Sequence, residues 1–250
     1  MSLGSDRTLM DISVVIPAKN EQDNIHHLVE EIVTVLTGRV EFEILYIDDA
    51  SSDLTYSYLT ALAKGPFPQI RVIRHQKSAG QSTAIWNGVQ HARGRWIVTM
   101  DADGQNDPAD IPAMMQQAQT ISSSPHFCIA GYRKNRKDTA WKRWQSKIAN
   151  SVRSRLLKDK TPDTGCGLKL LPRATFVLLP YFDHMHRYIP ALVRRLGGQI
   201  VIVEVNHRDR RFGNSNYDMW GRLGVGLVDM MGVMWLQRRS KQVQLHRADE

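Results

Sequence analysis

The sequence predicts an α/β fold with a mostly parallel central sheet, and two patterns support this prediction. Short apolar runs rich in β-branched and aromatic residues recur along the first half of the chain, at residues 12–16, 42–47, 70–73, 96–100 and 127–130. Between the first two runs, apolar residues recur at helical spacing: Ile25, Leu28, Val29, Ile32 and Leu36. Strands that alternate with helices need crossover connections, which favour parallel strands with helices on both faces of the sheet.

Local signals extend this pattern along the chain. Asn20 stands before the first helical stretch and is available as its N-cap. Asp107 precedes Pro108 and is expected to cap the helix that follows. Further on, a helix is expected to end near Leu196, before a strand at 199–205. The terminal segment has apolar residues at helical spacing: Trp220, Leu223, Leu227, Met231 and Met234.

Length and composition indicate one main domain in a reducing compartment. The chain has 250 residues, of which 42% are apolar, enough to bury a full core. Its two cysteines, Cys128 and Cys166, lack metal-ligand spacing and are expected to be reduced thiols. Residues 1–10 lack the apolar segment of a signal peptide and are expected to form a flexible leader. The longest apolar stretch, 223–236, is interrupted by Asp229 and is shorter than the roughly 20 residues that cross a bilayer.

The net charge of +8 favours anionic partners, such as nucleic acid, an anionic membrane or phosphorylated substrates. Residues 133–160 carry this excess, with eleven lysines and arginines against two aspartates. Within this stretch an apolar stripe recurs at helical spacing: Trp141, Trp144, Ile148, Val152 and Leu156. Such a basic amphipathic helix either packs its stripe on the core or lies at an anionic membrane surface, and the sequence leaves both open.

Two acidic pairs stand where predicted strands end. Asp48 and Asp49 follow the second strand, and Asp101 and Asp103 follow the fourth. Ligands of parallel sheets bind beyond the carboxyl ends of the strands. Divalent cations such as Mg²⁺ prefer carboxylate oxygens and keep phosphate oxygens as further ligands. The sequence therefore predicts a site for a metal and a diphosphate at this edge of the sheet.

The predicted metal ligands are Asp101 and Asp103, with the side-chain carbonyl of Gln105 as a neutral ligand. The alternative is a turn whose Asp and Asn side chains bond only to local backbone. The second acidic pair on a neighbouring strand favours the metal site over that alternative. No G-x-G-x-x-G follows the first strand and no Walker pattern occurs, which disfavours a dinucleotide-binding enzyme or a P-loop NTPase.

Seven motifs resemble, in the same order, those of glycosyltransferase family 2, specifically the polyprenyl-phosphate glycosyltransferases typified by dolichyl-phosphate mannosyltransferase. They are VVIPAKNEQDNI, IDDASSDLT, KSAGQSTAIWNG, MDADGQNDP, GYR, DTGCGLKL and RRFGNSNY, and they cover roughly residues 10–240. The resemblance implies a GT-A (Rossmann-like) fold with peripheral amphipathic helices. It also implies a nucleotide-sugar donor, Mg²⁺ or Mn²⁺ at the D-x-D motif and a polyprenyl phosphate acceptor.

Site residues carried over from the resemblance fall into four groups. The expected donor-binding residues are Pro17, Ala18, Glu21, Asp48, Asp49, Lys77, Asp101, Ala102 and Asp103. The expected metal ligands are Asp101, Asp103 and Gln105. The residues expected at the acceptor phosphate are Lys142, Arg143, Ser146 and Ser215. The expected catalytic residues are Asp103, Arg133 and Arg210.

The resemblance also implies an organisation of the chain. Residues 1–10 would be the leader and 11–217 the GT-A catalytic domain. Within that domain, 11–133 would bind the donor, and 134–217 would hold the basic interfacial helix and the acceptor site. Residues 218–250 would form a C-terminal amphipathic segment at the membrane interface.

The implied function is an inverting transfer of a sugar from GDP-mannose or a UDP-sugar to a polyprenyl phosphate, for cell-envelope glycan or glycolipid modification. The enzyme would be cytoplasmic and peripheral on the inner face of the membrane, with a membrane-protein partner or a homo-oligomer left open. One alternative is a family 2 enzyme that acts on a saccharide acceptor. A basic nucleic-acid-binding protein is disfavoured, because acidic residues stand at the sheet edge and no nucleic-acid-binding motif occurs.

Overall fold

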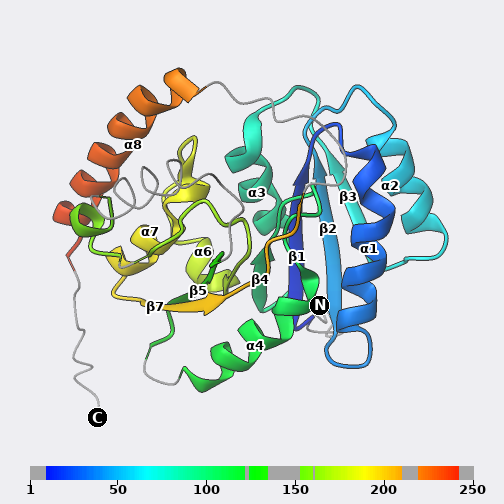
Figure 1. Ribbon diagram of the computed structural model, residues 1–250, viewed down its shortest axis with the longest axis horizontal. Helices are drawn as coiled ribbons and strands as arrows, with labels where there is room; N and C mark the ends of the chain where they lie inside the picture. Colours follow the sequence, from blue (N-terminus) through cyan, green and yellow to red (C-terminus); the bar gives the residue numbers. More distant parts are fainter. Residues whose placement is uncertain (1–9, 122–123, 135–152, 160, 210–218, 242–250) are drawn as a thin grey trace, which may run out of the picture.

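The computed structural model describes residues 10–121, 124–134, 153–159, 161–209 and 219–241. Its centre is a seven-stranded sheet of order β3-β2-β1-β4-β6-β5-β7 with helices packed around it (Figure 1). The strands are β1 Ile12–Ala18, β2 Phe42–Asp48, β3 Ile70–Arg74, β4 Trp96–Thr99, β5 Phe127–Tyr132, β6 Lys169–Pro172 and β7 Gln199–Glu204. The helices are α1 Gln22–Leu36, α2 Thr55–Lys64, α3 Gly80–His91, α4 Ile111–Thr120, α6 Arg173–Phe176, α7 Ile189–Arg195 and α8 Met219–Arg239, with the 3₁₀ turns η1 Pro108–Asp110 and η2 Met185–Arg187.

The sheet is mostly parallel, which confirms the fold class that the sequence predicts. Strands β3, β2, β1 and β4 run parallel, and β5 pairs parallel with β7. The β1–β2 register runs from Ile12 opposite Phe42 to Ala18 opposite Asp48, so these two strands end side by side. The carboxyl edge of the sheet therefore gathers the segments that follow β1, β2 and β4.

Strand β6 is the part of the sheet that the sequence did not predict. It runs antiparallel between β4 and β5, with Thr99 opposite Lys169 and Trp96 opposite Pro172. Only four residues long, it comes directly after a glycine-containing loop, so its apolar pattern is too short to mark a strand. Because β6 runs against β4, the loop before β6 lies beside the end of β4.

Two apolar clusters cover the two faces of the sheet. On one face, α1 packs its predicted stripe, including Ile25, Leu28 and Ile32, each at most 1% exposed. On the other face lies α3, and it approaches the sheet closely at Gly88. A Cβ atom there would stand 2.5 Å from Val15, so only glycine permits this contact. Burial on both faces supplies the main stabilisation, roughly 1.5–3 kcal/mol for each large apolar side chain.

Two capping predictions have different outcomes. Asp107 caps η1 by accepting a hydrogen bond from the Ala109 amide at 3.0 Å, as predicted. The prediction for Asn20 was wrong, because α1 has Glu21 at its N-cap position. Asn20 instead has a left-handed φ of 57°, and its side-chain carbonyl accepts from the Ser52 amide at 2.9 Å. It thus joins the loop after β1 to the loop after β2.

Helix α8 has two apolar sides. On one side Met230, Val233 and Met234 pack against the cluster around α7, beside which α8 lies in Figure 1. On the other side Leu227 and Met231 are 56% and 60% exposed. The predicted helical stripe of this segment is therefore divided, with Met234 inside and those two residues outside. Among the described helices, none has the length and apolar character needed to cross a bilayer.

Candidate active site

The acidic turn after β4 has a defined backbone. Its first amide, that of Asp101, donates to the side-chain carbonyl of Asn106 at 3.0 Å. The Asp103 carboxylate accepts from the Gln105 amide at 3.1 Å. Gly104 has a φ of 72°, a left-handed conformation that glycine adopts without strain. These contacts fold residues 101–106 back on themselves at the carboxyl edge of the sheet.

Charge is concentrated in this turn because Asp101 and Asp103 lie close together. Burial raises the pKa of Asp101, the Asp103 charge raises it further, and the result is a pKa of about 6. Lys169, Arg133 and a hydrogen bond from Gln81 act in the opposite direction. Burial and repulsion therefore destabilise the charged form of Asp101 by more than these three partners stabilise it.

Two residues from other segments fix the Asp101 side chain. Gln81, in the first turn of α3, donates its side-chain amide to the carboxylate at 2.8 Å. Gly167, in the loop before β6, packs directly against it, since a Cβ atom at position 167 would stand 2.2 Å from Asp101 Oδ2. No sequence pattern predicted a role for either residue. A glycine inside the DTGCGLKL motif was the signal that could have found Gly167, since a glycine can mark close approach to a functional group.

Lys169 places a buried cation behind the acidic turn. It is 3% exposed, and its ammonium group donates to the Cys166 carbonyl. Its charge lowers the pKa of Asp101 and also that of the Cys128 thiol, although burial raises the latter to about 12. Both cysteines are free and buried, which agrees with the expectation of reduced thiols.

The residues of the turn fit a divalent metal that arrives with a phosphate ligand. Within the described part of the chain, no group of three or more His, Cys, Asp or Glu side chains could hold a metal by itself. Mg²⁺ sites at nucleotides commonly use one or two carboxylates, with substrate phosphate oxygens and water completing the shell. Asp101 and Asp103 supply such a pair. Gln105 also lies in the turn, and its side-chain amide reaches the Arg208 carbonyl at 3.5 Å.

Arg133, a predicted catalytic residue, is held by Asp163. The guanidinium donates through Nε at 2.6 Å and Nη2 at 2.8 Å to the two carboxylate oxygens. Burial disfavours the charge of Arg133, but the bonds and charge of Asp163 outweigh burial and raise the pKa of the guanidinium. Asp163 is therefore the residue that positions Arg133.

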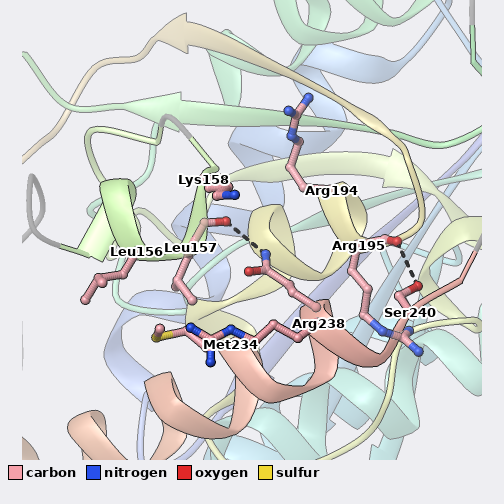
Figure 2. A pocket seen from close by; sticks show the side chains of 9 residues that line it. Leu156, Leu157, Lys158, Arg194, Arg195, Met234, Arg238 and Ser240 are labelled. Atoms are coloured by element: carbon pink, nitrogen blue, oxygen red, sulfur yellow. Dashed lines mark hydrogen bonds between the residues drawn. The ribbon is translucent and has the colours of Figure 1, made fainter.

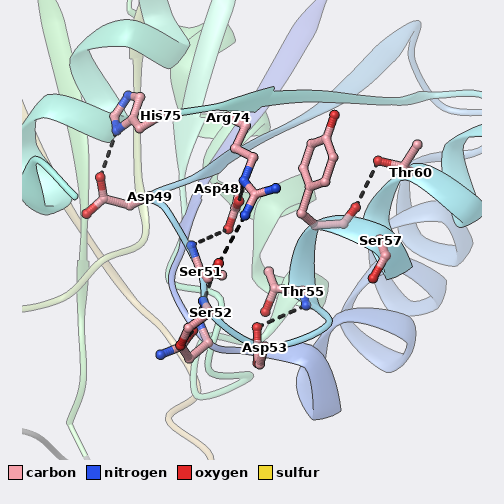
Figure 3. A network of polar contacts seen from close by, with 12 residues as sticks. Asp48, Asp49, Ser51, Ser52, Asp53, Thr55, Ser57, Thr60, Arg74 and His75 are labelled. Atoms are coloured by element: carbon pink, nitrogen blue, oxygen red, sulfur yellow. Dashed lines mark hydrogen bonds and ion pairs between the residues drawn. The ribbon is translucent and has the colours of Figure 1, made fainter. Parts of the chain in front are cut away.

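The second acidic pair, Asp48 and Asp49, contacts several protein partners (Figure 3). Asp48 accepts from Ser51 and pairs with Arg74 at 3.0 Å. Asp49 accepts from His75 at 2.7 Å and from the side chain or backbone of residues 78–80. Burial raises the pKa of Asp49, but these hydrogen bonds outweigh burial and lower it below its usual range. The pair shapes the loops that follow β2 and β3.

The remaining predicted donor residues lie at the same edge. Pro17 and Ala18 end β1, and Ala102 lies within the acidic turn at 5% exposure. Glu21 precedes α1, and its carboxylate accepts from Asn24 at 2.8 Å. Lys77 is exposed in the loop between β3 and α3. The structure thus brings the predicted donor residues to one edge of the sheet.

Residues 207 and 208, which follow β7, pack against the acidic turn. His207 forms an isolated antiparallel bridge with Asn106, and the Arg208 amide donates to the Gln105 carbonyl at 3.0 Å. The Arg208 side chain joins Asp107 to Glu31 of α1, at 2.6 Å to each carboxylate. Arg208 therefore stabilises the turn.

Five predicted residues lie outside the described residues, namely Lys142, Arg143, Ser146, Arg210 and Ser215.

Beside Gln81 lies a buried polar pair that sequence reasoning missed. Ser82 is 1% exposed, and its hydroxyl lies 2.7 Å from His186 Nδ1 of η2. Burial lowers the pKa of His186 to about 3, with smaller contributions from Lys169, Arg187 and His184. The imidazole is therefore neutral at physiological pH. It joins α3 to η2 and so supports the helix that carries Gln81.

The amino-acid sequence of this chain resembles those of known proteins. A model described as glycosyl transferase family 2 matches residues 13–177. Dodecaprenyl-phosphate galacturonate synthase of Rhizobium johnstonii is 31% identical over 233 residues, which is 92% of this chain and 68% of that protein. An undecaprenyl-phosphate 4-deoxy-4-formamido-L-arabinose transferase of Enterobacter sp. is 32% identical, over 82% of this chain and 62% of that protein. The chain thus spans about two thirds of the length of these relatives.

Solved structures give the same fold. Glucosyl-3-phosphoglycerate synthase from Mycobacterium tuberculosis, solved with UDP, superposes with a TM-score of 0.66 at 18% identity, covering 93% of this chain and 82% of that one. The same enzyme with Mg²⁺ and UDP gives a TM-score of 0.65 at 19% identity, over 93% and 81%. These matches confirm the GT-A fold that the motifs implied. The chain belongs to glycosyl transferase family 2.

Proposed function

We propose that this protein is an inverting, metal-dependent hexosyltransferase that moves a sugar from a nucleoside diphosphate to a polyprenyl phosphate. The donor would be GDP-mannose or a UDP-sugar, and the product a lipid-phosphate-linked sugar for cell-envelope glycan or glycolipid modification. The names of the relatives support a polyprenyl phosphate as the acceptor, because both act on such lipids.

The observation that carries the proposal is the pair of mutually repelling carboxylates, Asp101 and Asp103, at the end of β4. Asp101 and Asp103 repel each other, and the pKa of Asp101 rises to about 6. A divalent cation held by these two carboxylates would neutralise the diphosphate leaving group. Gln81 and Gly167 hold the Asp101 carboxylate in position, and Asp163 orients the Arg133 guanidinium. The protein thus presents positive charge and metal ligands at one edge.

The acceptor chemistry explains why no general base has to be assigned. A sugar hydroxyl is a poor nucleophile near neutral pH and needs a base. A phosphate monoester has its second pKa at about 6 and arrives as an oxyanion. The protein then has to offset repulsion between acceptor and donor, and to hold the attack in line. In this proposal Arg133 and Arg210 act at the phosphates, and the acceptor phosphate meets Lys142, Arg143, Ser146 and Ser215.

The proposal also places the protein at the cytosolic face of the membrane as a peripheral enzyme. The donor half would be residues 11–133, the acceptor part 134–217, and the interfacial segment 218–250. The exposed apolar side of α8 supports the interfacial role. A membrane-protein partner or a homo-oligomer would be compatible with this arrangement.

The test is a transfer assay with the purified full chain, undecaprenyl phosphate in detergent and Mn²⁺ or Mg²⁺. Separate reactions receive GDP-mannose, UDP-glucose, UDP-galacturonate or UDP-N-acetylglucosamine, and the butanol-extractable product is measured. We expect one donor to give a glycolipid, and chelation by EDTA to abolish its formation. The Asp103→Asn variant should lose the reaction, because it removes a metal ligand without changing side-chain volume.

A matched control is Glu30→Gln, which neutralises an exposed carboxylate of α1 whose ion-pair partner within the described residues is the exposed His26. This variant should retain activity. Transfer to a saccharide acceptor with none to undecaprenyl phosphate would refute the lipid acceptor. Full metal-dependent activity of Asp103→Asn would refute the metal site.

A further inference from the structure

Glu31 of α1 lies outside the motifs of the site, yet it is joined to the acidic turn through one arginine. The Nη1 atom of Arg208 donates to both carboxylate oxygens of Glu31, at 2.7 and 2.6 Å. The Nη2 atom of Arg208 donates to Asp107 Oδ1 at 2.6 Å. One guanidinium therefore connects α1, the segment after β7 and the residue that follows the acidic turn.

Asp107 fixes the end of the acidic turn. Its carboxylate also accepts from the Asn206 side chain at 3.4 Å. The residue directly before it, Asn106, accepts from the Asp101 amide at the start of the turn at 3.0 Å. A shift of Asp107 therefore reaches both ends of the segment that carries the predicted metal ligands.

The backbone of Arg208 contacts the same turn. Its amide donates to the Gln105 carbonyl at 3.0 Å, and the preceding residue, His207, forms a β-bridge with Asn106. Arg208 thus contacts the turn with its main chain and the residue after the turn with its side chain. Its position sets the position of the turn.

Glu31 holds Arg208 from a rigid helix. The neighbouring residues Leu28 and Ile32 are at most 1% exposed and anchor α1 on the sheet. Burial disfavours the charge of Arg208, but the hydrogen bonds and charges of Glu31 and Asp107 outweigh burial and raise the pKa of the guanidinium. Without Glu31, the guanidinium would keep Asp107 as its carboxylate partner and regain the rotamer freedom that the second carboxylate removes.

Arg208 differs from the arginines around a pocket of 480 Å³ between the ends of α7 and α8. The guanidinium groups of Arg194, Arg195 and Arg238 point away from one another there (Figure 2). They do not converge on one group. Arg208, in contrast, is held between two carboxylates from different elements.

We infer that Glu31 is a positioning residue, which acts through Arg208 to hold the acidic turn in the geometry that binds the metal and the donor diphosphate. The inference rests on the proposed function, because the metal and the diphosphate belong to it. Replacing a residue that supports metal ligands typically costs about 10–100-fold in metal affinity or activity. Glu31 acts through a further side chain, so we expect a loss at the lower end of that range.

The experiment compares Glu31→Ala with Glu30→Ala in the full chain. The two glutamates are neighbours on α1, and each pairs with a histidine four residues earlier, Glu30 with His26 at 3.4 Å and Glu31 with His27 at 2.9 Å. They differ in the contact with Arg208. Calorimetry measures Mn²⁺ binding in the presence of UDP, or of GDP if the wild type binds that nucleotide instead. The transfer assay measures KM for the donor and for the lipid acceptor.

We expect Glu31→Ala to weaken Mn²⁺ binding by about tenfold and to raise the donor KM by a similar factor, with the acceptor KM unchanged. Glu31→Gln keeps a neutral acceptor for Arg208 and should lose about threefold. Glu30→Ala should stay within about twofold of the wild type, because its ion pair is exposed. Melting temperatures should stay within about 4 °C. A merely structural defect would instead lower the number of binding sites and leave the affinity of the folded fraction unchanged.

A second comparison tests the route through Arg208. Arg208→Gln alone should weaken Mn²⁺ binding at least as much as Glu31→Ala, and the double variant should be no weaker than Arg208→Gln, since the second change removes a contact that is already lost. Additive losses in the double variant, or equal Mn²⁺ affinity in Glu31→Ala and Glu30→Ala, would overturn the inference. A wild-type chain that binds Mn²⁺ and nucleotide but transfers no sugar would refute the proposed function alone, and the binding comparison would still decide the role of Glu31.

Discussion

Replacing Gly167 by alanine should disable the metal site without unfolding the protein. A Cβ atom at this position would stand 2.2 Å from Asp101 Oδ2 and 2.7 Å from Oδ1. Ordinary contact begins at 3.4 Å, so the carboxylate or the loop has to move by about 1 Å. The loop is tied, since the Gly167 carbonyl accepts from the Thr99 hydroxyl at 2.7 Å. The carboxylate is therefore the group that moves.

The expected loss follows from that displacement. A carboxylate moved by about 1 Å cannot keep both its bond from Gln81 and its ligand geometry, and misplacement on this scale costs about a hundredfold in rate. We therefore expect Gly167→Ala to lower kcat/KM by about a hundredfold and to weaken Mn²⁺ binding. Titration calorimetry with Mn²⁺ and UDP checks the binding, and the transfer assay checks the rate.

Gly165→Ala is the matched control in the same loop. Its Cβ atom would stand 3.2 Å from the flexible end of Arg133 and 3.7 Å from Asp163, so a shift of a few tenths of an ångström accommodates it. We expect this variant to keep Mn²⁺ affinity and kcat/KM within about threefold. Wild-type Mn²⁺ affinity in Gly167→Ala, at an unchanged melting temperature, would refute the role of Asp101 as a ligand.

Three further predictions concern the charges around the site. Asp163→Asn leaves the buried Arg133 without its partner charge and should lower the free energy of unfolding by about 3 kcal/mol or more, measured by urea denaturation. Mn²⁺ affinity should fall about tenfold per pH unit below pH 6, where a proton competes for Asp101, and should be level above it. Because burial lowers the pKa of His186 from 6.5 to about 3, the folded chain should lose stability as pH falls through that interval, and His186→Gln should reduce this loss in acid melting experiments.

The sequence predicts the parallel part of the fold well because its signals are local. Each of the predicted parallel strands is an apolar run bounded by polar residues, and the α1 stripe repeats at helical spacing over about three turns. Asp107 is also a local case, since its carboxylate bonds two residues ahead. Where an interaction lies within one element or one turn, the residue pattern carries it.

The missed features depend on contacts between distant parts of the chain. Gln81 reaches Asp101 across 20 residues, and Arg133 reaches Asp163 across 30. Strand β6 pairs antiparallel with a strand more than sixty residues earlier, and its own four residues show no clear period. Asn20 was predicted to cap a helix, but its side chain instead accepts a hydrogen bond from Ser52 in the loop after β2. Only the folded chain brings these partners together.

The acidic residues at the sheet edge divide into two groups by what balances their charge. Asp49 is balanced by four hydrogen-bond donors, and Asp163 by an arginine. At Asp101 the balance fails, because burial and the Asp103 charge raise its pKa to about 6. An uncharged amide side chain at position 101 would avoid this repulsion, so the carboxylate does not contribute to the stability of the fold. The repulsion is useful only if a cation relieves it, so Asp101→Asn should stabilise the metal-free chain while it removes metal binding.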